Sequence, residues 1–375
     1  MFFLYLLKMK KYLNIIITSL IFSCTQPLDI KEIKGITLKA PKPENIDKFL
    51  DFVRDVLEPD EINTIIFRIG WNYEFSSHNE LIDEDALSKA NVRKIVKHCN
   101  SLGIQVIPLL NLLGHQSTLI RDKNGVAVKT KMRPLLANYQ EFDETPEIKL
   151  PENYRWPNKD GLYTKSYCPL HPDVHEIVLT IVDELINAFR SNYFHAGMDE
   201  VFYIGNDNCP RCSGKSKAKL FADEVNLVNA FLKEKNVELM IWGDRMIDGF
   251  ETGLGMWEAS KNNTHGSVDL IDKDVIITDW HYKTVTNTHD YFINKGFRVI
   301  TCPYNISDVA IGNYDNYKTY NSDLYLGLLQ TIWMPTEDFI DLYYDRPVDV
   351  FEGRRGSLDT YKKLVSLWKS ESISE

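Results

Sequence analysis

Residues 193–202 read Tyr-Phe-His-Ala-Gly-Met-Asp-Glu-Val-Phe, an aromatic and apolar run that ends abruptly in two adjacent carboxylates. A run of this kind bounded by polar residues is typical of a buried strand. The acids at its end, Asp199 and Glu200, are costly to bury unless the strand end opens into a wet cleft. Neighbouring carboxylates repel, so one of them is expected to hold its proton to a higher pH, as a general acid must. On the pair alone, an acidic loop that caps the next helix is the simpler interpretation, and the surrounding sequence must decide.

The two acids also pose a geometric problem. In a regular strand the side chains of Asp199 and Glu200 point to opposite faces. For both to reach one site, the chain must bend or bulge after Met198, and Gly197 permits such a bend.

Strand-like apolar runs recur along the chain, and segments with apolar residues at helical spacing lie between most of them. The predicted strands are Ile33–Leu38, Ile62–Ile69, Ile104–Leu113, Tyr193–Met198, Val237–Trp242, Val275–Trp280, Phe297–Cys302 and Leu324–Trp333. The predicted helices are Asp47–Leu57, Ala86–Leu102, Val174–Arg190, Ala218–Lys235 and His289–Lys295. Eight strands alternating with helices predict an α/β fold of the (β/α)8 TIM-barrel type, with a doubly wound open sheet as the alternative. In both folds ligands bind at the C-terminal ends of the strands.

The residues that follow these strands combine aromatic rings with hydrogen-bonding groups. Aromatic faces stack on the C–H face of a pyranose, and carboxylates or amides fix its hydroxyls, so this mixture favours a sugar site. A single tryptophan at a strand end usually serves packing, but four of the seven lie there, namely Trp71, Trp242, Trp280 and Trp333. The candidate substrate-binding residues are Arg68, Asn72, His115, Trp242, Asp244, Asp279, Trp280, Tyr282, Tyr304 and Trp333.

The N-terminus predicts export. Three lysines precede an apolar run over residues 12–22, which is too short to span a bilayer comfortably, and Ser23 and Cys24 follow. This order is typical of a secretory signal, and a small residue directly before Cys24 resembles the lipobox of bacterial lipoproteins. We expect Cys24 to carry lipid; a cleaved signal with an incidental cysteine is the alternative.

The expected domain organisation is a signal peptide at 1–23, a short tether at 24–32 and one catalytic barrel at 33–375. The segment Thr130–Tyr163 contains four prolines and is interpreted as a long loop, because the alternation of strands and helices resumes after it. The net charge of −10 argues against nucleic acid as a partner. We expect contact with a membrane only through the lipid on Cys24, in the bacterial cell envelope (periplasm or outer membrane).

These motifs resemble one known family. Residues 195–201, His-Ala-Gly-Met-Asp-Glu-Val, resemble the His-x-Gly-x-Asp-Glu signature of glycoside hydrolase family 20, the β-N-acetylhexosaminidases. Residues 114–117, Gly-His-Gln-Ser, resemble its Pro-Gly-His-Ser segment, and residues 327–333 resemble the Gly-x-x-x-x-x-Trp of its last strand. The resemblance covers the chain from about Asn63 onward.

The resemblance implies a retaining glycoside hydrolase that removes β-linked N-acetylhexosamine by substrate-assisted catalysis, without a cofactor or catalytic metal. It casts Glu200 as the general acid and base. Asp199 would hold the acetamide N–H while the acetamide oxygen attacks the anomeric carbon and forms an oxazolinium ion. His115 would orient the acid, and Tyr304 or Tyr282 would donate to the acetamide oxygen. The expected walls of the pocket are Trp242, Trp280 and Trp333.

The chain departs from the family pattern in several places, so we expect a divergent, single-barrel lipoprotein member. Residues 35–41 lack the Asp-x-x-x-Arg-like segment whose arginine grips sugar hydroxyls in the family. Residues 68–72, Arg-Ile-Gly-Trp-Asn, replace a His-x-x-Asp-Asp pattern, and residues 242–244, Trp-Gly-Asp, replace Trp-x-Glu. Arg68 either takes over the hydroxyl contact or is a salt-bridge partner at the strand end.

Two cysteines, Cys209 and Cys212, have the spacing of zinc ligands. A zinc site needs two more ligands, and the neighbouring sequence offers none, so we assign no metal. In an exported protein, a local disulfide or two thiols are at least as plausible. We expect Cys99, Cys168 and Cys302 to be buried packing residues.

Three functions remain open from the sequence. The first is the hexosaminidase implied by the resemblance. The second is a glycosidase of the same barrel type that acts on a non-acetamido sugar, with Asp244 or Asp279 as a carboxylate nucleophile. The third is a non-catalytic glycan-binding lipoprotein, against which the intact Asp199, Glu200 and His115 argue.

Overall fold

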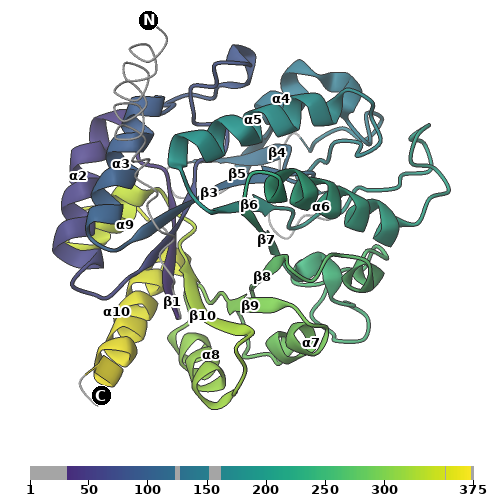
Figure 1. The fold of residues 1–375 in the computed structure, drawn as a ribbon. Helices are drawn as coiled ribbons and strands as arrows, with labels where there is room; N and C mark the ends of the chain where they lie inside the picture. Colours follow the sequence, from purple (N-terminus) through teal and green to yellow (C-terminus); the bar gives the residue numbers. More distant parts are fainter. Residues whose placement is uncertain (1–31, 123–126, 152–161, 351, 373–375) are drawn as a thin grey trace, which may run out of the picture.

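The computed structural model describes residues 32–122, 127–151, 162–350 and 352–372. At its centre lies a closed parallel barrel, with helices around it (Figure 1). The barrel strands are β1 (Ile33–Lys39), β2 (Thr64–Arg68), β3 (Gln105–Leu112), β6 (Tyr193–Gly197), β7 (Glu238–Trp242), β8 (Ile276–Asp279), β9 (Arg298–Thr301) and β10 (Tyr325–Thr331). Each coincides with one predicted strand, so the (β/α)8 barrel is confirmed and the open-sheet alternative is wrong.

The pairing of the first strand with the last closes the barrel. Strand β1 pairs with β10 in parallel, from Ile33 opposite Gly327 to Thr37 opposite Thr331. On its other side β1 pairs with β2, and the order around the barrel is β1-β10-β9-β8-β7-β6-β3-β2. Because every strand runs in the same direction, all C-terminal ends meet at one rim, where the candidate site residues gather.

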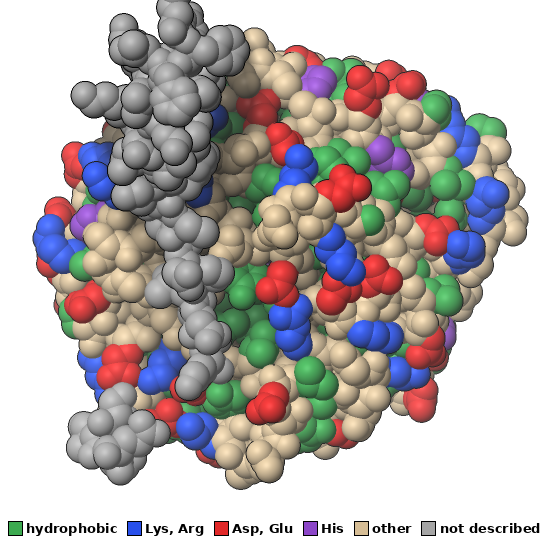
Figure 2. Space-filling model, in the orientation of Figure 1, with side chains coloured by type: hydrophobic (Ala, Val, Ile, Leu, Met, Phe, Trp, Pro, Cys, Tyr) green, Lys and Arg blue, Asp and Glu red, His purple; other side chains and the backbone are tan. Residues whose placement is uncertain are grey.

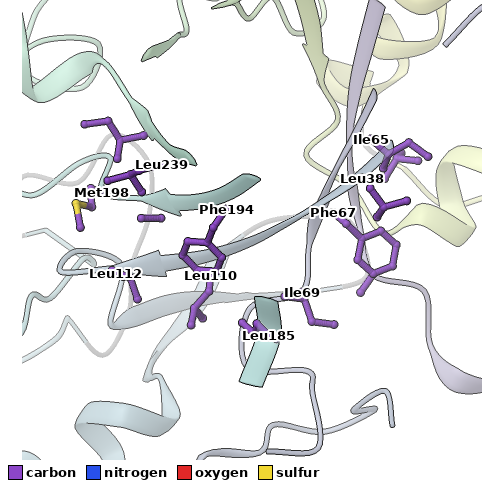
Figure 3. Close-up of a cluster of buried hydrophobic side chains, with 14 of the residues drawn as sticks. Leu38, Ile65, Phe67, Ile69, Leu110, Leu112, Leu185, Phe194, Met198 and Leu239 are labelled. Carbon is purple, nitrogen blue, oxygen red and sulfur yellow. The ribbon is translucent and has the colours of Figure 1, made fainter. Parts of the chain in front are cut away.

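The barrel strands are buried on both faces and separate two apolar layers. In β2, Ile65 and Phe67 point outward into the layer between strands and helices, whereas Ile66 points into the barrel interior. Figure 3 shows Phe67 and Ile69 in this outer layer, with Leu185 of helix α5 (Val174–Phe189) nearby. This two-sided burial explains why the strands read as nearly continuous apolar runs in the sequence.

The predicted helices are all present. They are α2 (Ile46–Phe52) with a following π turn at Val53–Leu57, α3 (Lys89–Ser101), α5 (Val174–Phe189), α6 (Lys217–Lys233) and α7 (Thr288–Asn294). Helix α3 starts at a capping box, in which the Ser88 hydroxyl accepts the Asn91 N–H at 3.1 Å and the Asn91 side chain accepts the Ser88 N–H.

Beyond residue 300, three helices were not predicted, namely α8 (Ser307–Thr319), α9 (Thr336–Tyr343) and α10 (Glu352–Ser372). Helix α10 contains two glycines and many charged residues, so its apolar pattern is weak. Its position is set by tertiary contacts: Tyr361 Oη donates to Asp60 Oδ2 at 2.8 Å, and Lys369 Nζ donates to Asp60 Oδ1 at 2.6 Å.

The interpretation of Thr130–Tyr163 as a long loop is partly wrong. Strands β4 (Ser117–Arg121) and β5 (Ala127–Met132) pair antiparallel outside the barrel, and the short helix α4 (Pro134–Asn138) follows. In β5 half of the side chains are exposed, so the strand carries little of the apolar signal that marks the barrel strands. Beyond the helix, the chain returns to the barrel, where the Tyr167 N–H donates to the Leu113 carbonyl at 3.1 Å.

The predicted signal peptide, Cys24 and all of the tether but Glu32 lie outside the described residues. Among the helices that the structure does describe, none combines the length and apolar character needed to cross a membrane. Figure 2 shows acidic and basic side chains interspersed over the face in view.

Candidate active site

The end of β6 bends, as the sequence predicted. Gly197, Met198 and Glu200 have φ values of 67°, 63° and 50°, all in the left-handed region. A Cβ on Gly197 would lie 1.8 Å from Oδ1 of Asn111 on β3, so glycine is required by both its φ and this close approach. Because of the bend, Asp199 and Glu200 face the same side chain.

That side chain is His115, which follows β3. Its Nε2 lies 3.1 Å from Asp199 Oδ2 and 3.3 Å from Glu200 Oε2. Burial alone would lower the pKa of His115, but the two carboxylates outweigh it and raise the pKa to about 10. The structure therefore places an imidazolium cation between the acids at neutral pH.

The sequence led us to expect that repulsion between the two acids would raise the pKa of one of them. The His115 cation changes this expectation for Asp199. Burial would raise the pKa of Asp199, but the charge and hydrogen bond of His115 outweigh it and hold that pKa below its ordinary value. Asp199 is thus ionised. Its Oδ2 is paired with His115, while its buried Oδ1 accepts no hydrogen bond from the other residues that the structure describes.

Glu200 is held from two sides. The Tyr163 hydroxyl donates to Glu200 Oε2 at 3.2 Å, and the Glu200 backbone N–H donates to Asp244 Oδ2 at 3.0 Å. The side chain of Glu200 therefore faces His115 and Tyr163, while its backbone is fixed to the loop after β7.

Asp244, which accepts the Glu200 N–H, is itself held by a buried ion pair with Arg245. Arg245 Nε donates to Asp244 Oδ2 at 2.6 Å, and Trp280 Nε1 donates to Oδ1 at 3.3 Å. Arg245 is fully buried and also donates to three backbone carbonyls between residues 256 and 259. Burial raises the pKa of Asp244 to about 6, although Arg245 opposes this shift. Both Asp244 oxygens are engaged by protein groups, and a direct contact between Asp244 and a sugar stays a prediction.

Asp279, the other acid considered as a nucleophile, is also engaged. Its Oδ2 accepts the Thr288 hydroxyl at 2.6 Å, and its Oδ1 lies 3.1 Å from His281 Nε2. His281 in turn lies 3.2 Å from Glu258 Oε2. Burial would lower the pKa of His281, but the two carboxylates outweigh it and raise the pKa to about 9. This buried network lies behind Trp280, whose ring stacks on His281.

The structure brings together the aromatic residues expected to form the pocket. Trp333 Nε1 donates to the Tyr282 hydroxyl at 2.8 Å, and the Trp333 ring lies 6.2 Å from that of Trp242. The Tyr282 ring lies 4.9 Å from Trp280 and 5.2 Å from Tyr304. These rings form a continuous aromatic wall at the C-terminal rim of the barrel.

Three other residues singled out in the sequence make different contacts. Trp71 is buried in the outer apolar layer against Phe75, so it belongs to the core and not to this wall. The Asn72 side chain donates to the Glu84 carbonyl. Arg68 donates to the Ile332 carbonyl at 2.7 Å and places its guanidinium 4.5 Å from the Trp333 ring centre, so it braces the wall. Burial lowers the pKa of Arg68 to about 10.

His195, the first residue of the family-like signature, has a structural role. Its Nδ1 accepts the Gly197 N–H at 3.0 Å, and its Nε2 lies 2.8 Å from the Thr278 hydroxyl. Because that hydroxyl donates to the Ile241 carbonyl, it accepts from His195, which therefore carries its proton on Nε2. Burial lowers the pKa of His195 to about 3, so the ring is neutral and links β6 to β8.

Sequence reasoning missed two aromatic residues of the site, Tyr163 and Trp257. Their rings stack at 6.0 Å, and the Tyr163 ring also lies 6.1 Å from His115. Both lie in long connections and not at strand ends, where the sequence predicted the sugar-binding residues. Topology alone could have placed them near the site, because long loops after barrel strands gather at the rim that holds it.

Comparison with known proteins identifies the family. Residues 66–334 match the catalytic domain of glycosyl hydrolase family 20. Among curated proteins, the lacto-N-biosidase of Bifidobacterium bifidum is 22% identical over 342 residues, covering 83% of this chain and 26% of that protein. The β-hexosaminidase of Vibrio furnissii is 23% identical over 193 residues, covering 52% of this chain and 26% of that protein. This chain thus spans about a quarter of the length of these relatives.

Solved structures agree on the fold. A chitobiase of Flavobacterium johnsoniae superimposes with a TM-score of 0.59 at 18% identity, over 91% of this chain and 52% of that chain. The β-N-acetylhexosaminidase of Bacteroides fragilis gives a TM-score of 0.58 at 13% identity, over 91% of this chain and 69% of that chain. The match to the family's catalytic domain covers well over half of the sequence, and the chain therefore belongs to glycosyl hydrolase family 20.

Proposed function

We propose that this protein is a retaining glycoside hydrolase that removes β-linked N-acetylhexosamine from glycans through an oxazolinium intermediate. One observation carries the proposal. Asp199 is ionised and tied to His115 by one oxygen, while its other oxygen is buried without a donor among the described residues. A carboxylate in this state is suited to accept the N–H of a 2-acetamido group. Glu200 stands beside it, within reach of the same histidine.

In the proposed reaction, Asp199 accepts the acetamide N–H and increases the nucleophilicity of the acetamide oxygen. That oxygen attacks the anomeric carbon while the bond to the leaving group breaks, and Glu200 gives its proton to the departing oxygen. The resulting oxazolinium ion is stabilised by the Asp199 carboxylate. Glu200 then takes a proton from water, which attacks the anomeric carbon and opens the ring. Two inversions at that carbon give overall retention.

The aromatic wall supports a role in holding the acetamide and the sugar ring. The Tyr282 hydroxyl accepts from Trp333 Nε1 at 2.8 Å and lies 3.3 Å from Thr331 Oγ1, and with a sugar bound we expect it to turn its own proton to the acetamide oxygen. The buried Nε1–H of Trp242 has no acceptor among the described residues, and a bound sugar would supply one. These open donors suit a neutral, oxygen-rich ligand.

The proposal is tested with aryl β-glycosides that differ only in the 2-acetamido group. The purified chain is expected to hydrolyse the acetamido substrates and not their 2-hydroxy counterparts. A thiazoline mimic of the oxazolinium ion should inhibit strongly, because it resembles the charged intermediate. Equal turnover of both substrate types, with a fluorosugar trapped on Asp244 or Asp279, would support the carboxylate-nucleophile alternative instead. Binding of glycans without turnover of any of them would support the non-catalytic alternative.

We also propose that the protein is an exported lipoprotein anchored through Cys24. Support for this comes from the N-terminal sequence, where a basic and an apolar segment precede Ser23 and Cys24. Mass spectrometry of the membrane fraction should find a diacylglyceryl-modified Cys24 as the first residue. Cys24→Ser should leave the protein unlipidated, and an unmodified Cys24 in the native protein would contradict the proposal.

A further inference from the structure

Three thiols and one carboxylate converge beside the active-site loops. They belong to Cys168, Cys209, Cys212 and Glu144, all four of them buried, and their ligand atoms lie within 4.8 Å of one another. The Sγ of Cys168 is 3.6 Å from that of Cys209 and 3.4 Å from that of Cys212. The sequence-based expectation that Cys209 and Cys212 have no further ligands nearby is therefore wrong, because the fold supplies both from a distant segment.

The distances match a tetrahedral metal centre. With metal–sulfur bonds of about 2.3 Å, the sulfurs of a zinc site lie about 3.7 Å apart, whereas the sulfurs of a disulfide lie about 2.05 Å apart. The measured separations from Cys168 are close to the first value. Cys209 and Cys212 lie on one tight turn, in which the Ser213 N–H donates to the Cys209 carbonyl at 2.9 Å. Such a turn presents two thiols to one point.

Lys165, a cation three residues before Cys168, is already engaged. Lys165 Nζ lies 2.9 Å from Asp143 Oδ2 and also donates to the carbonyls of Thr145 and Ile148. One oxygen of Glu144 accepts the Asn206 N–H at 2.9 Å, and its other oxygen is buried facing the thiols. Four acidic groups in a buried space are costly to ionise unless a cation joins them.

We propose that Cys168, Cys209, Cys212 and Glu144 bind one Zn²⁺ ion in a closed structural site. Three soft thiolates favour zinc over magnesium or calcium, and the carboxylate completes the tetrahedron. Because all four ligands come from the protein, the site leaves no coordination position for substrate, and it is structural and not catalytic.

The site joins two segments that position the general acid. Cys168 lies five residues after Tyr163, whose hydroxyl donates to Glu200. Cys209 lies nine residues after Glu200 itself, in the loop that leaves β6. A metal at this place ties the two segments together at the rim of the barrel. Loss of the ion should loosen the Tyr163 contact and lower kcat more than it changes KM.

The test measures metal content in the purified full chain. Elemental analysis of protein from zinc-supplied cells should find about one zinc ion per chain, held by four protein ligands. Replacement by Co²⁺ should give the thiolate charge-transfer and visible absorption bands of a tetrahedral site. The double variant Cys209→Ser, Cys212→Ser should lose the zinc, whereas Cys99→Ala, which removes a buried thiol from α3 outside the cluster, should keep it.

A milder variant covers the case in which the double variant does not fold. Glu144→Gln keeps all three thiols but removes one anionic ligand, so it should release zinc to a chelator faster than the unaltered chain. A purified protein with well under one zinc per chain and no Co²⁺ spectrum would overturn the proposal. So would a mass lower by two hydrogen atoms, because it would show a disulfide among these cysteines.

Discussion

Replacing Gly197 with alanine is expected to destabilise the fold and to displace the acid pair. Gly197 has a φ of 67°, where an L-residue costs about 1–2 kcal/mol. The added Cβ would lie 1.8 Å from Asn111 Oδ1 and 2.9 Å from the Asn111 Cα. Because the clash includes the backbone of β3, the strands must move apart, which adds about 1–3 kcal/mol. The free energy of unfolding should therefore fall by about 2–5 kcal/mol in total.

The matched control is Gly103→Ala. Gly103 has a φ of 75° and no atom within 4 Å of an added Cβ, so this variant carries only the cost of the backbone conformation. Urea unfolding followed by tryptophan fluorescence should show the larger loss for Gly197→Ala. Its kcat/KM should also fall, because Asp199 and Glu200 follow the displaced bend. Equal losses of stability in the two variants, with full activity in Gly197→Ala, would refute the argument from close approach.

Four further outcomes are expected. Glu200→Gln should lower kcat/KM on an unactivated glycan by roughly 10²–10⁴-fold. It should largely spare the turnover of a dinitrophenyl glycoside, whose leaving group needs no proton. Equal losses of kcat/KM on the two substrates would contradict the role of Glu200 as the acid. Asp199→Asn should impair both substrates. Trp333→Ala should lower kcat/KM by roughly tenfold, which corresponds to about 1.4 kcal/mol, with little change in Tm. A large fall in Tm with intact turnover would instead show that the half-buried Trp333 is a core residue. The folded-state pKa of His281 is raised to about 9, so its contribution to stability is complete below about pH 6.5 and is lost as the pH rises through 9. Urea unfolding across this range should show a weaker pH dependence for His281→Gln; an unchanged slope would contradict the raised pKa.

Local sequence patterns were enough to predict the barrel and the bend that brings Asp199 and Glu200 to one side. Strands buried on both faces must be apolar along their whole length, so β2 and β6 are visible as apolar runs. Parallel strands place all their C-terminal ends at one rim, so the acids after β6 had to lie near the residues after β3 and β7. The need for a bend at Gly197 also followed from local geometry, since neighbouring strand residues face opposite sides.

Contacts between segments far apart in the chain decided the rest. The sequence predicted that repulsion would raise the pKa of one of the two acids, but the tertiary fold places His115 between them, and it holds the Asp199 pKa below its ordinary value. Tyr163 reaches Glu200 from a connection with no periodic pattern.

The cysteines show the same limit most clearly. The spacing of Cys209 and Cys212 alone marks them as a candidate pair of ligands, because a turn of that length brings both thiols to one side. Cys168 and Glu144 come within 4.8 Å of the pair only through the tertiary fold. Electrostatic environment and ligand number depend on which groups meet in space, and local sequence determines only those that meet within one strand, helix or turn.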